Sequence, residues 1–118
     1  MPLIALALAA ALSSAPAADP AADNEADARC VAAIAAIIGS GEVEGDVRAG
    51  LFGGVMFFVG RIEGRDPGYD LKAGLLKLAE RPDYETILKS DRARCGKIMQ
   101  ERGNMITDIG DALSAAGH

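Results

Sequence analysis

The sequence predicts an all-α domain, a small bundle of four or five helices held by one disulfide. Apolar residues recur every three or four positions along most of the chain, which is the period of an amphipathic helix. No segment has the sustained alternation of apolar and polar residues that is typical of strands. The 118 residues, with two cysteines, suit a single domain.

The first 17 residues have the composition of a secretory signal peptide. They contain no charged side chain, an apolar run from Leu3 to Leu12, and small residues at Ala15 and Ala17 around Pro16. A buried first helix or a membrane anchor are the alternatives, but the run is shorter than the roughly 20 residues of a membrane span. We therefore expect a periplasmic or secreted protein without an integral membrane span after signal removal.

Export favours a disulfide between Cys30 and Cys95. In an oxidising compartment a pair of cysteines in a small domain is typical of a disulfide, whereas in the cytosol two free thiols are the usual state. Closing a loop of roughly 65 residues destabilises the unfolded chain by about 4 kcal/mol in the chain-entropy model. The chain has no Cys-x-x-Cys motif and one histidine, His118, so we predict no metal and no cofactor.

The first helix is expected between Glu25 and Ile38. We expect residues 18–23 to be a flexible lead-in, and residues 24–116 to form a single helical domain. Gly39 is the predicted stop of the first helix. Its apolar side carries Cys30, Ile34 and Ile37 at helical spacing.

Residues 47–62 are predicted to form the central helix, because more than half of its circumference is apolar. Glycine weakens a helix by up to about 1 kcal/mol relative to alanine, so glycines here predict helix backbones that pack unusually close. These glycines are Gly50, Gly53, Gly54 and Gly60.

The segment "GRDPG" is predicted to join two helices. Gly64 suits the end of the second helix, Asp66 is a good N-cap, and Pro67 has the backbone angle preferred at the first helical position. The third helix then carries an apolar face of Leu71, Leu75 and Leu78.

A short helical turn after Pro82 and a long last helix that begins at Ser90 or Asp91 complete the predicted bundle. Three glycines recur every seven residues and share one side of the last helix, where a neighbouring helix would approach closely; chance spacing is the alternative. These are Gly96, Gly103 and Gly110. The apolar positions of that helix are Cys95, Ile98, Met99, Ile106, Ile109 and Leu113, with Arg102 in the same series.

The charge pattern excludes several classes of function. A net charge of −5, with scattered basic residues, argues against a partner of nucleic acid or anionic lipid. Asp66 and Asp70 have the helical spacing of an acid–base pair, but at a helix start two such carboxylates are far more often a cap and a solvated first-turn charge. We therefore predict no catalytic residue and no enzyme.

Arg61 and Arg65 are candidate binding residues. Together with backbone N–H groups at the next helix start they could hold an anion. We favour the alternative that they form ion pairs with Glu63, Asp66 or Asp70 and stabilise the helix joint.

Phe57 and Phe58 complete the candidate binding surface. Neighbouring helix residues point about 100° apart, so Met56, Phe57 and Phe58 cannot all face one core. Phe57 is the residue that we expect to be left over. Either another helix covers it, which we favour, or it belongs to an exposed apolar patch.

The segments "RCVAAIAAI", "FFVGRIEGRDPGYDL" and "RCGKIMQERG" together resemble a group of small, exported, two-cysteine bacterial proteins of uncharacterised function. That resemblance implies a disulfide-linked helical domain and no activity. More remotely, the chain is similar to HdeA-type periplasmic acid-stress chaperones, which expose apolar surface when acid loosens them. The shared features are Cys30, Cys95 and the apolar segment between them.

We expect a non-enzymatic periplasmic or secreted protein that binds other polypeptides, with a chaperone-like role under acid stress. The alternative is a partner-specific inhibitor or immunity-type protein that blocks a secreted enzyme. A hydrolase that uses carboxylates is a third class.

Overall fold

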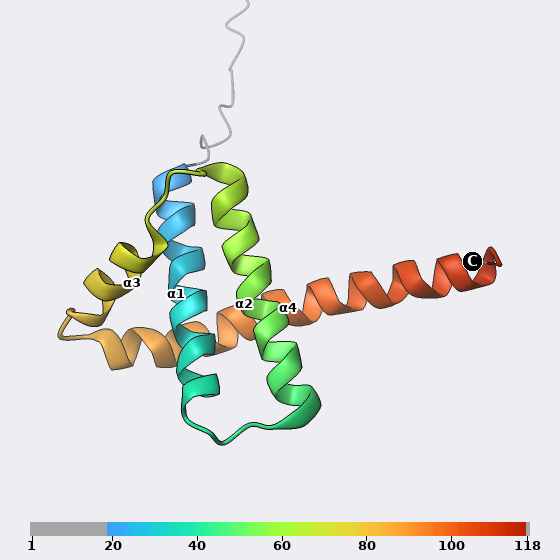
Figure 1. Ribbon diagram of the computed structural model, residues 1–118, viewed down its shortest axis with the longest axis horizontal. Helices are drawn as coiled ribbons and strands as arrows, with labels where there is room; N and C mark the ends of the chain where they lie inside the picture. The colour runs from blue at the N-terminus through green and yellow to red at the C-terminus, as the bar shows by residue number, and fades with distance from the viewer. Residues whose placement is uncertain (1–18, 118) are drawn as a thin grey trace, which may run out of the picture.

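The computed structural model describes residues 19–117, which form four helices and no strand (Figure 1). Helices α1 (Pro20–Gly39) and α2 (Gly45–Arg65) lie side by side, followed by the short α3 (Leu71–Ala79) and the long α4 (Tyr84–Ala115). The prediction of an all-α bundle is confirmed. The predicted signal peptide and His118 lie outside the described residues.

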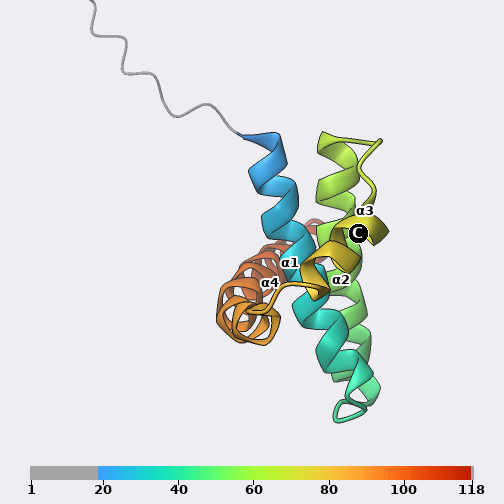
Figure 2. The same cartoon turned by 90° about the vertical axis from the view of Figure 1, so that its left-hand side faces the viewer.

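Helix α1, and not α2 as predicted, is the central helix. It contacts each of the other three helices, and α4 crosses both α1 and α2 (Figures 1 and 2). The small side chains of Ala28, Ala32 and Ala33 on α1 are buried and let neighbouring helices approach from more than one side. Helix α2 instead leaves part of its wide apolar face exposed, including Phe52 and Met56.

The buried apolar residues form two clusters that share α1. The first cluster surrounds the disulfide and consists of Cys30, Val31, Ile34, Phe58 and Cys95. The second cluster lies where α1 meets α3 and the start of α4, and consists of Ala32, Ala33, Leu78, Ile87 and Leu88. Both apolar clusters include residues of α1, so this helix holds together the packed part of the protein, residues 19–99, which we call the body.

The predicted disulfide is present. Cys30 of α1 and Cys95 of α4 are joined with an S–S distance of 2.02 Å and a Cα–Cα distance of 5.5 Å. Both residues are buried. The bond therefore fixes the point at which α4 crosses α1.

The first helix begins earlier than predicted. The carboxylate of Asp19 accepts hydrogen bonds from the backbone N–H groups of Ala21 and Ala22 at 3.1 and 3.3 Å. Pro20 is the first helical residue, where its missing N–H is not needed. Helix α1 therefore starts before Asn24, and residues 20–23 are helical rather than a lead-in.

The second Asp-Pro pair forms a turn and not the predicted helix start. The Asp66 carboxylate accepts from the N–H of Gly68 at 3.0 Å, and its carbonyl accepts from the N–H of Tyr69 at 3.1 Å. Glycine after Asp66-Pro67 suits a β-turn, whereas two alanines follow the first Asp-Pro pair and continue the helix. Helix α3 starts only at Leu71.

The other parts of the predicted joint are close to their expected places. Helix α2 ends at Arg65, one residue after Gly64. The N-cap of α3 is Asp70, whose carboxylate accepts from the N–H of Ala73 at 3.0 Å. The sequence predicted Asp66 as the cap and Asp70 as a solvated first-turn charge, so the cap lies four residues later than predicted.

Helix α4 begins at Tyr84 and is continuous through Ser90 and Asp91, where the sequence predicted a separate start. The Ser90 hydroxyl donates back to the carbonyl of Ile87 at 2.9 Å, and so it does not cap a helix. Neither glycine nor proline interrupts residues 84–95, and Leu88 is buried in the second cluster. The predicted short turn and the predicted last helix are therefore one helix.

The close packing predicted for the glycines of α2 is found at Gly54. A Cβ built there would meet the Met99 sulfur at 2.8 Å and the Ile34 Cδ1 at 3.4 Å. No atom lies within 4 Å of a Cβ at Gly50, Gly53 or Gly60. The same is true of Gly96, Gly103 and Gly110 in α4, so no helix within residues 19–117 approaches these three glycines.

Within residues 19–117 no helix has an apolar stretch of the length that a membrane crossing needs.

Candidate functional site

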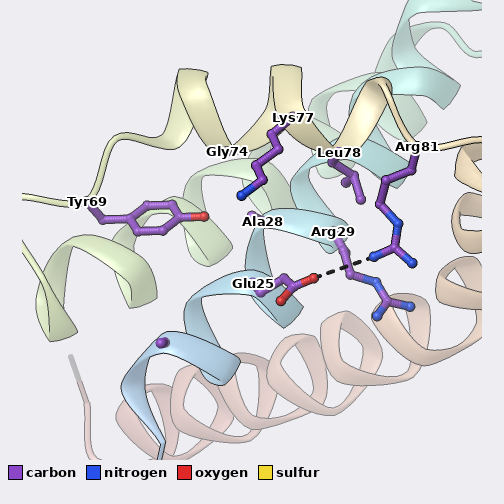
Figure 3. Close-up of a pocket in the computed structure, with 9 residues that line it drawn as sticks. Glu25, Ala28, Arg29, Tyr69, Gly74, Lys77, Leu78 and Arg81 are labelled. Carbon is purple, nitrogen blue, oxygen red and sulfur yellow. Dashed lines mark ion pairs between the residues drawn. The ribbon is translucent and has the colours of Figure 1, made fainter.

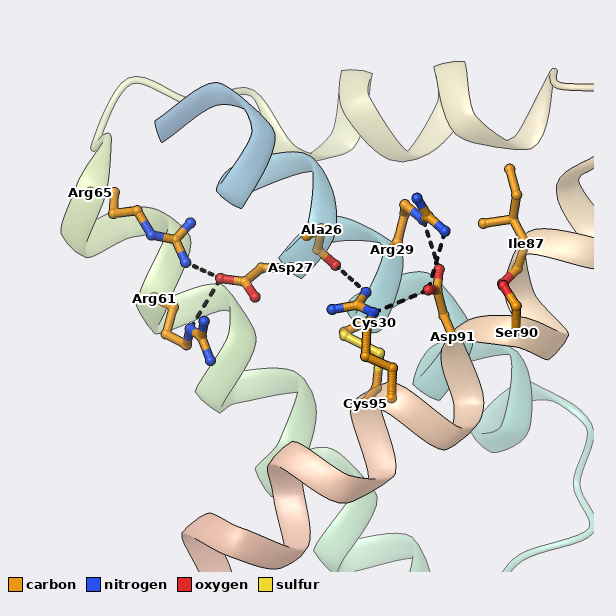
Figure 4. The surroundings of a disulfide bond; sticks show 11 residues. Ala26, Asp27, Arg29, Cys30, Arg61, Arg65, Ile87, Ser90, Asp91 and Cys95 are labelled. Atoms are coloured by element: carbon orange, nitrogen blue, oxygen red, sulfur yellow. Dashed lines mark hydrogen bonds and ion pairs between the residues drawn. A yellow bond between two sulfur atoms is a disulfide. The ribbon is translucent and has the colours of Figure 1, made fainter. Parts of the chain in front are cut away.

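Arg61 and Arg65 both bind the buried carboxylate of Asp27 on α1 (Figure 4). The Arg61 Nε lies 3.1 Å from Asp27 Oδ2, and Arg65 makes a short contact to the same oxygen. Arg65 also donates to the Asn24 side-chain oxygen at 2.6 Å. The ion-pair interpretation is correct in kind, but the partner comes from another helix and is none of the three acidic residues that we considered.

A second buried carboxylate, Asp91 of α4, has a matching arrangement on the other side of the disulfide (Figure 4). Arg29 donates to both of its oxygens, at 2.7 and 3.2 Å. Arg94 donates to Asp91 at 3.2 Å and to the carbonyl of Ala26 at 2.9 Å. These ion pairs tie α4 to α1 beside Cys95.

Sequence reasoning missed both buried carboxylates, although a signal was present. Asp27 precedes Cys30 by three residues and Asp91 precedes Cys95 by four, so each carboxylate lies on the same side of its helix as a buried cysteine. A charged residue in that position needs a partner, because an unpaired buried charge is very unfavourable. The ion pairs at Asp27 and at Asp91 are therefore structural. Because Arg61 and Arg65 both bind Asp27, they are not free to form the anion site considered above.

Phe58 belongs to the core and not to a binding surface, which corrects the prediction. It is wholly buried beside Cys30 and Cys95. Phe57 is half-buried and meets the Phe58 ring edge to face, with 5.2 Å between ring centroids. The guanidinium of Arg102 lies 6.0 Å from the Phe57 centroid, so α4 partly covers this ring as we expected.

Phe57 lines a groove of about 260 Å³ between α2 and α4, which we call the glycine groove. Three glycines of α2 remove the side chains that would otherwise fill it. The lining residues are Gly50, Gly53, Gly54 and Phe57 from α2, and Met99, Arg102, Gly103 and Ile106 from α4.

Beyond the groove, residues 100–115 of α4 project away from the other helices, and we call this segment the arm (Figure 1). All of its residues are exposed. Ile106 is 65% and Ile109 50% exposed, and Met105 and Leu113 are exposed as well. These side chains continue the apolar stripe of Leu88, Cys95 and Met99, so one stripe is covered in its first half and bare in its second.

A second, more polar pocket of about 330 Å³ lies between α1 and α3 (Figure 3). Glu25, Arg29, Lys77 and Arg81 line its rim, and Glu25 lies 3.8 Å from Arg81. Tyr69 also lines this pocket, and burial, followed by the charge of Glu25, raises its pKa above the usual 10.0.

Gly74 makes room for the Tyr69 ring in this polar pocket. A Cβ at Gly74 would lie 2.6 Å from the Tyr69 hydroxyl oxygen, so only glycine accommodates this placement. Among residues 19–117, no three potential metal ligands gather there or elsewhere.

The sequence matches no family model, no curated protein and no solved structure at a significant level. The likeness to exported two-cysteine proteins therefore stays a prediction.

Proposed function

We propose that this chain is a non-enzymatic periplasmic or secreted protein that binds other polypeptides with its arm and glycine groove. The observation that carries the proposal is the bare apolar stripe of the arm, formed by Met105, Ile106, Ile109 and Leu113. Apolar surface of this extent, bordered by polar residues, is typical of protein interaction sites. Covering one large apolar side chain stabilises a complex by about 1.5 to 3 kcal/mol.

The disulfide supports the compartment. Cys30 and Cys95 are both buried and paired, and such bonds persist in the periplasm and outside the cell rather than in the cytosol.

The charge balance supports a chaperone-like role in acid. At about pH 2 to 3 most of the 17 carboxylates lose their charge, whereas the 12 basic side chains keep theirs, so a large positive net charge approaching +12 develops. Repulsion then loosens the helices while the disulfide keeps the body compact, and further apolar surface is exposed.

The test measures how the protein suppresses aggregation of an unrelated acid-denatured protein, at neutral pH and at about pH 2 to 3. We expect suppression by the wild-type chain and its loss in the arm variant Ile106→Ser, Ile109→Ser. The matched control is Phe52→Ser, Met56→Ser, which removes two exposed apolar side chains from α2. Phe58 is unsuitable as a probe, because a polar residue there would disrupt the core.

Equal activity of both double variants would argue against the arm as the binding surface. No suppression by the wild-type chain at either pH would contradict the chaperone-like role.

The alternative function is inhibition of one secreted enzyme. The glycine groove favours this alternative, since it places Phe57 beside Arg102, and aromatic and arginine side chains dominate the energetics of specific interfaces. A pull-down from periplasm at neutral and acidic pH separates the two functions. An inhibitor retains one partner, whereas a chaperone-like protein retains many.

A further inference from the structure

The bare side of the arm carries the seven-residue pattern of a helix that pairs with another helix. Met99, Ile106 and Leu113 form one row with this spacing, and Arg102 and Ile109 form the adjacent row. Two such rows make the contact seam of paired helices. Gly103 and Gly110 flank the seam, and each would have only open space around a Cβ. Residues without side chains beside a seam let two helix backbones approach closely.

A partner on its apolar face would stabilise the arm. The arm continues the packed first half of α4 and so needs no new nucleus, but its two glycines weaken it by up to about 1 kcal/mol each. Helices of this length are usually stabilised by packing of their apolar face. Within the described residues this face is largely bare, since all of residues 100–115 are exposed, although Arg102 at its beginning lies against Phe57 of α2.

We propose that a second copy of this chain covers the arm, so that two arms form an antiparallel helix pair with a two-fold axis near Thr107 and Asp108. This proposal rests on the proposed function, because it requires the arm to be a polypeptide-binding surface, and it names the partner.

The seam is self-complementary in this register. Ile106 of each copy lies against Ile109 of the other, and Arg102 lies at the level of Leu113 of the other. Since Arg102 lines the glycine groove, the Leu113 side chain of the second copy reaches that groove. The volume of about 260 Å³ accommodates a side chain of this size.

Charge favours the antiparallel over the parallel arrangement. A parallel pair would place Arg102 against Arg102 in the seam, and like charges at an interface are unfavourable. The antiparallel pair brings Arg102 to the end of the partner arm that carries Asp108 and Asp111. It also separates the two bodies to opposite ends of the helix pair.

The area is sufficient for a specific but modest dimer. Specific interfaces bury on the order of 1,200 Å² or more, and a seam of two short arms with two filled grooves belongs at the lower end of that range. We therefore expect dissociation in the micromolar range. A client polypeptide would compete with the second copy for the same surface.

Sedimentation of the oxidised full-length chain from about 1 to about 200 µM tests the proposal across this range. We expect a reversible monomer–dimer equilibrium. Ile109→Lys would place a charge in the apolar seam and raise the dissociation constant by about 100-fold or more. Asn104→Lys is the matched control, because it adds the same side chain to the opposite, exposed side of the arm and leaves the equilibrium unchanged.

A spin label at Ser114→Cys reports the orientation. In the antiparallel register the two labels are about 20 Å apart along the helix axis, because residue 114 lies opposite residue 101 of the other copy. In a parallel pair they would be about 10 Å apart, which is the distance between packed helices.

The outcomes separate this inference from the proposed function. A chain that stays monomeric, with fast hydrogen exchange in the arm, overturns the second copy as partner and leaves polypeptide binding standing. A monomer in which the backbone N–H groups of the arm exchange slowly with solvent hydrogen also overturns the inference. Slow exchange in a monomer would mean that another segment of the same chain covers the arm. A dimer insensitive to Ile109→Lys, or labels at the parallel distance, also overturns it. A seam-dependent antiparallel dimer without suppression of aggregation supports this inference and contradicts the chaperone-like role.

Discussion

The two halves of helix α4 have the same apolar spacing and opposite surroundings. In the first half, residues 84–99, the side chains of Leu88 and Cys95 are buried against α1. In the arm, Ile106 and Ile109 hold equivalent positions and are exposed. Apolar periodicity therefore indicates which side of a helix will be buried. It does not indicate whether a segment of the same chain buries that side.

The halves also differ in how they use charge. Asp91 in the first half is buried and paired with two arginines from α1 and α4. In contrast, Glu101 at the beginning of the arm lies 4.0 Å from Lys97 just before it, and both are exposed, an arrangement that contributes little to stability. Changes in the body should therefore affect unfolding strongly, and matched changes in the arm should affect it weakly.

Removal of the disulfide is expected to give the largest effect. Cys30→Ala, Cys95→Ala frees a loop of roughly 65 residues in the unfolded state and should cost about 4 kcal/mol. In a domain of this size that corresponds to a melting temperature lower by more than about 15 °C, measured by circular dichroism. Ile109→Ser in the arm, measured in dilute solution, should melt as the wild type does. A double cysteine variant that melted within a few degrees of wild type would show that the ion pairs and core hold α4 without the bond.

The buried ion pairs should give the next largest effect. Arg61→Ala, Arg65→Ala leaves the Asp27 carboxylate buried without a counter-charge, and should cost about 3 kcal/mol in denaturant unfolding. Asp27→Asn should cost less, about 1 to 2 kcal/mol, because both arginines can still reach water. Asp108→Asn in the arm is the control, with no expected change. If Asp27→Asn lowered the free energy of unfolding more than Arg61→Ala, Arg65→Ala did, burial without a counter-charge would destabilise the arginines and not the carboxylate.

Gly54 and Gly110 provide the same substitution in the two regions. Gly54→Leu inserts a side chain against Met99 and Ile34 and should cost about 1 to 3 kcal/mol. Gly54→Ala should be nearly neutral, because the end of the flexible Met99 side chain can move. Gly110→Leu meets open space, and in dilute solution it should leave the melting temperature unchanged or raise it slightly. A Gly54→Leu protein as stable as wild type would mean that α2 and α4 do not pack closely there.

Tyr69 should give the smallest effect. Burial and the nearby charges of Glu25 and Asp70 raise its pKa above 10.0, so the folded state keeps the proton longer than the unfolded state. This contribution to stability is complete below about pH 10 and is lost as the pH rises through the folded pKa. Tyr69→Phe should therefore flatten the fall of the melting temperature above about pH 10. If the melting temperature of Tyr69→Phe fell with pH as steeply as that of the wild type, another group in the body would cause the loss of stability at high pH.

Local chemistry determined much of this protein from the sequence alone. Helical periodicity and stop signals located the helices and the end near Gly39, because they depend on residues within a few turns of one another. With two cysteines, Cys30 had one possible partner. One error also had a local cause. Asp66-Pro67 was predicted to start a helix because the effect of the next residue, Gly68, was underestimated.

Only the tertiary structure decided which faces meet. Asp27 binds arginines that are 34 and 38 residues away in sequence, and Asp91 binds Arg29 over 62 residues. Phe58 lies in the core and Phe57 at the groove because α2 presents one particular side to α1 and α4. The exposed arm is also decided by the tertiary structure. The spacing of the sequence gives it an apolar stripe, but the other helices do not extend far enough along α4 to bury that stripe. Periodicity acts over a few residues, whereas packing acts between segments that the chain brings together.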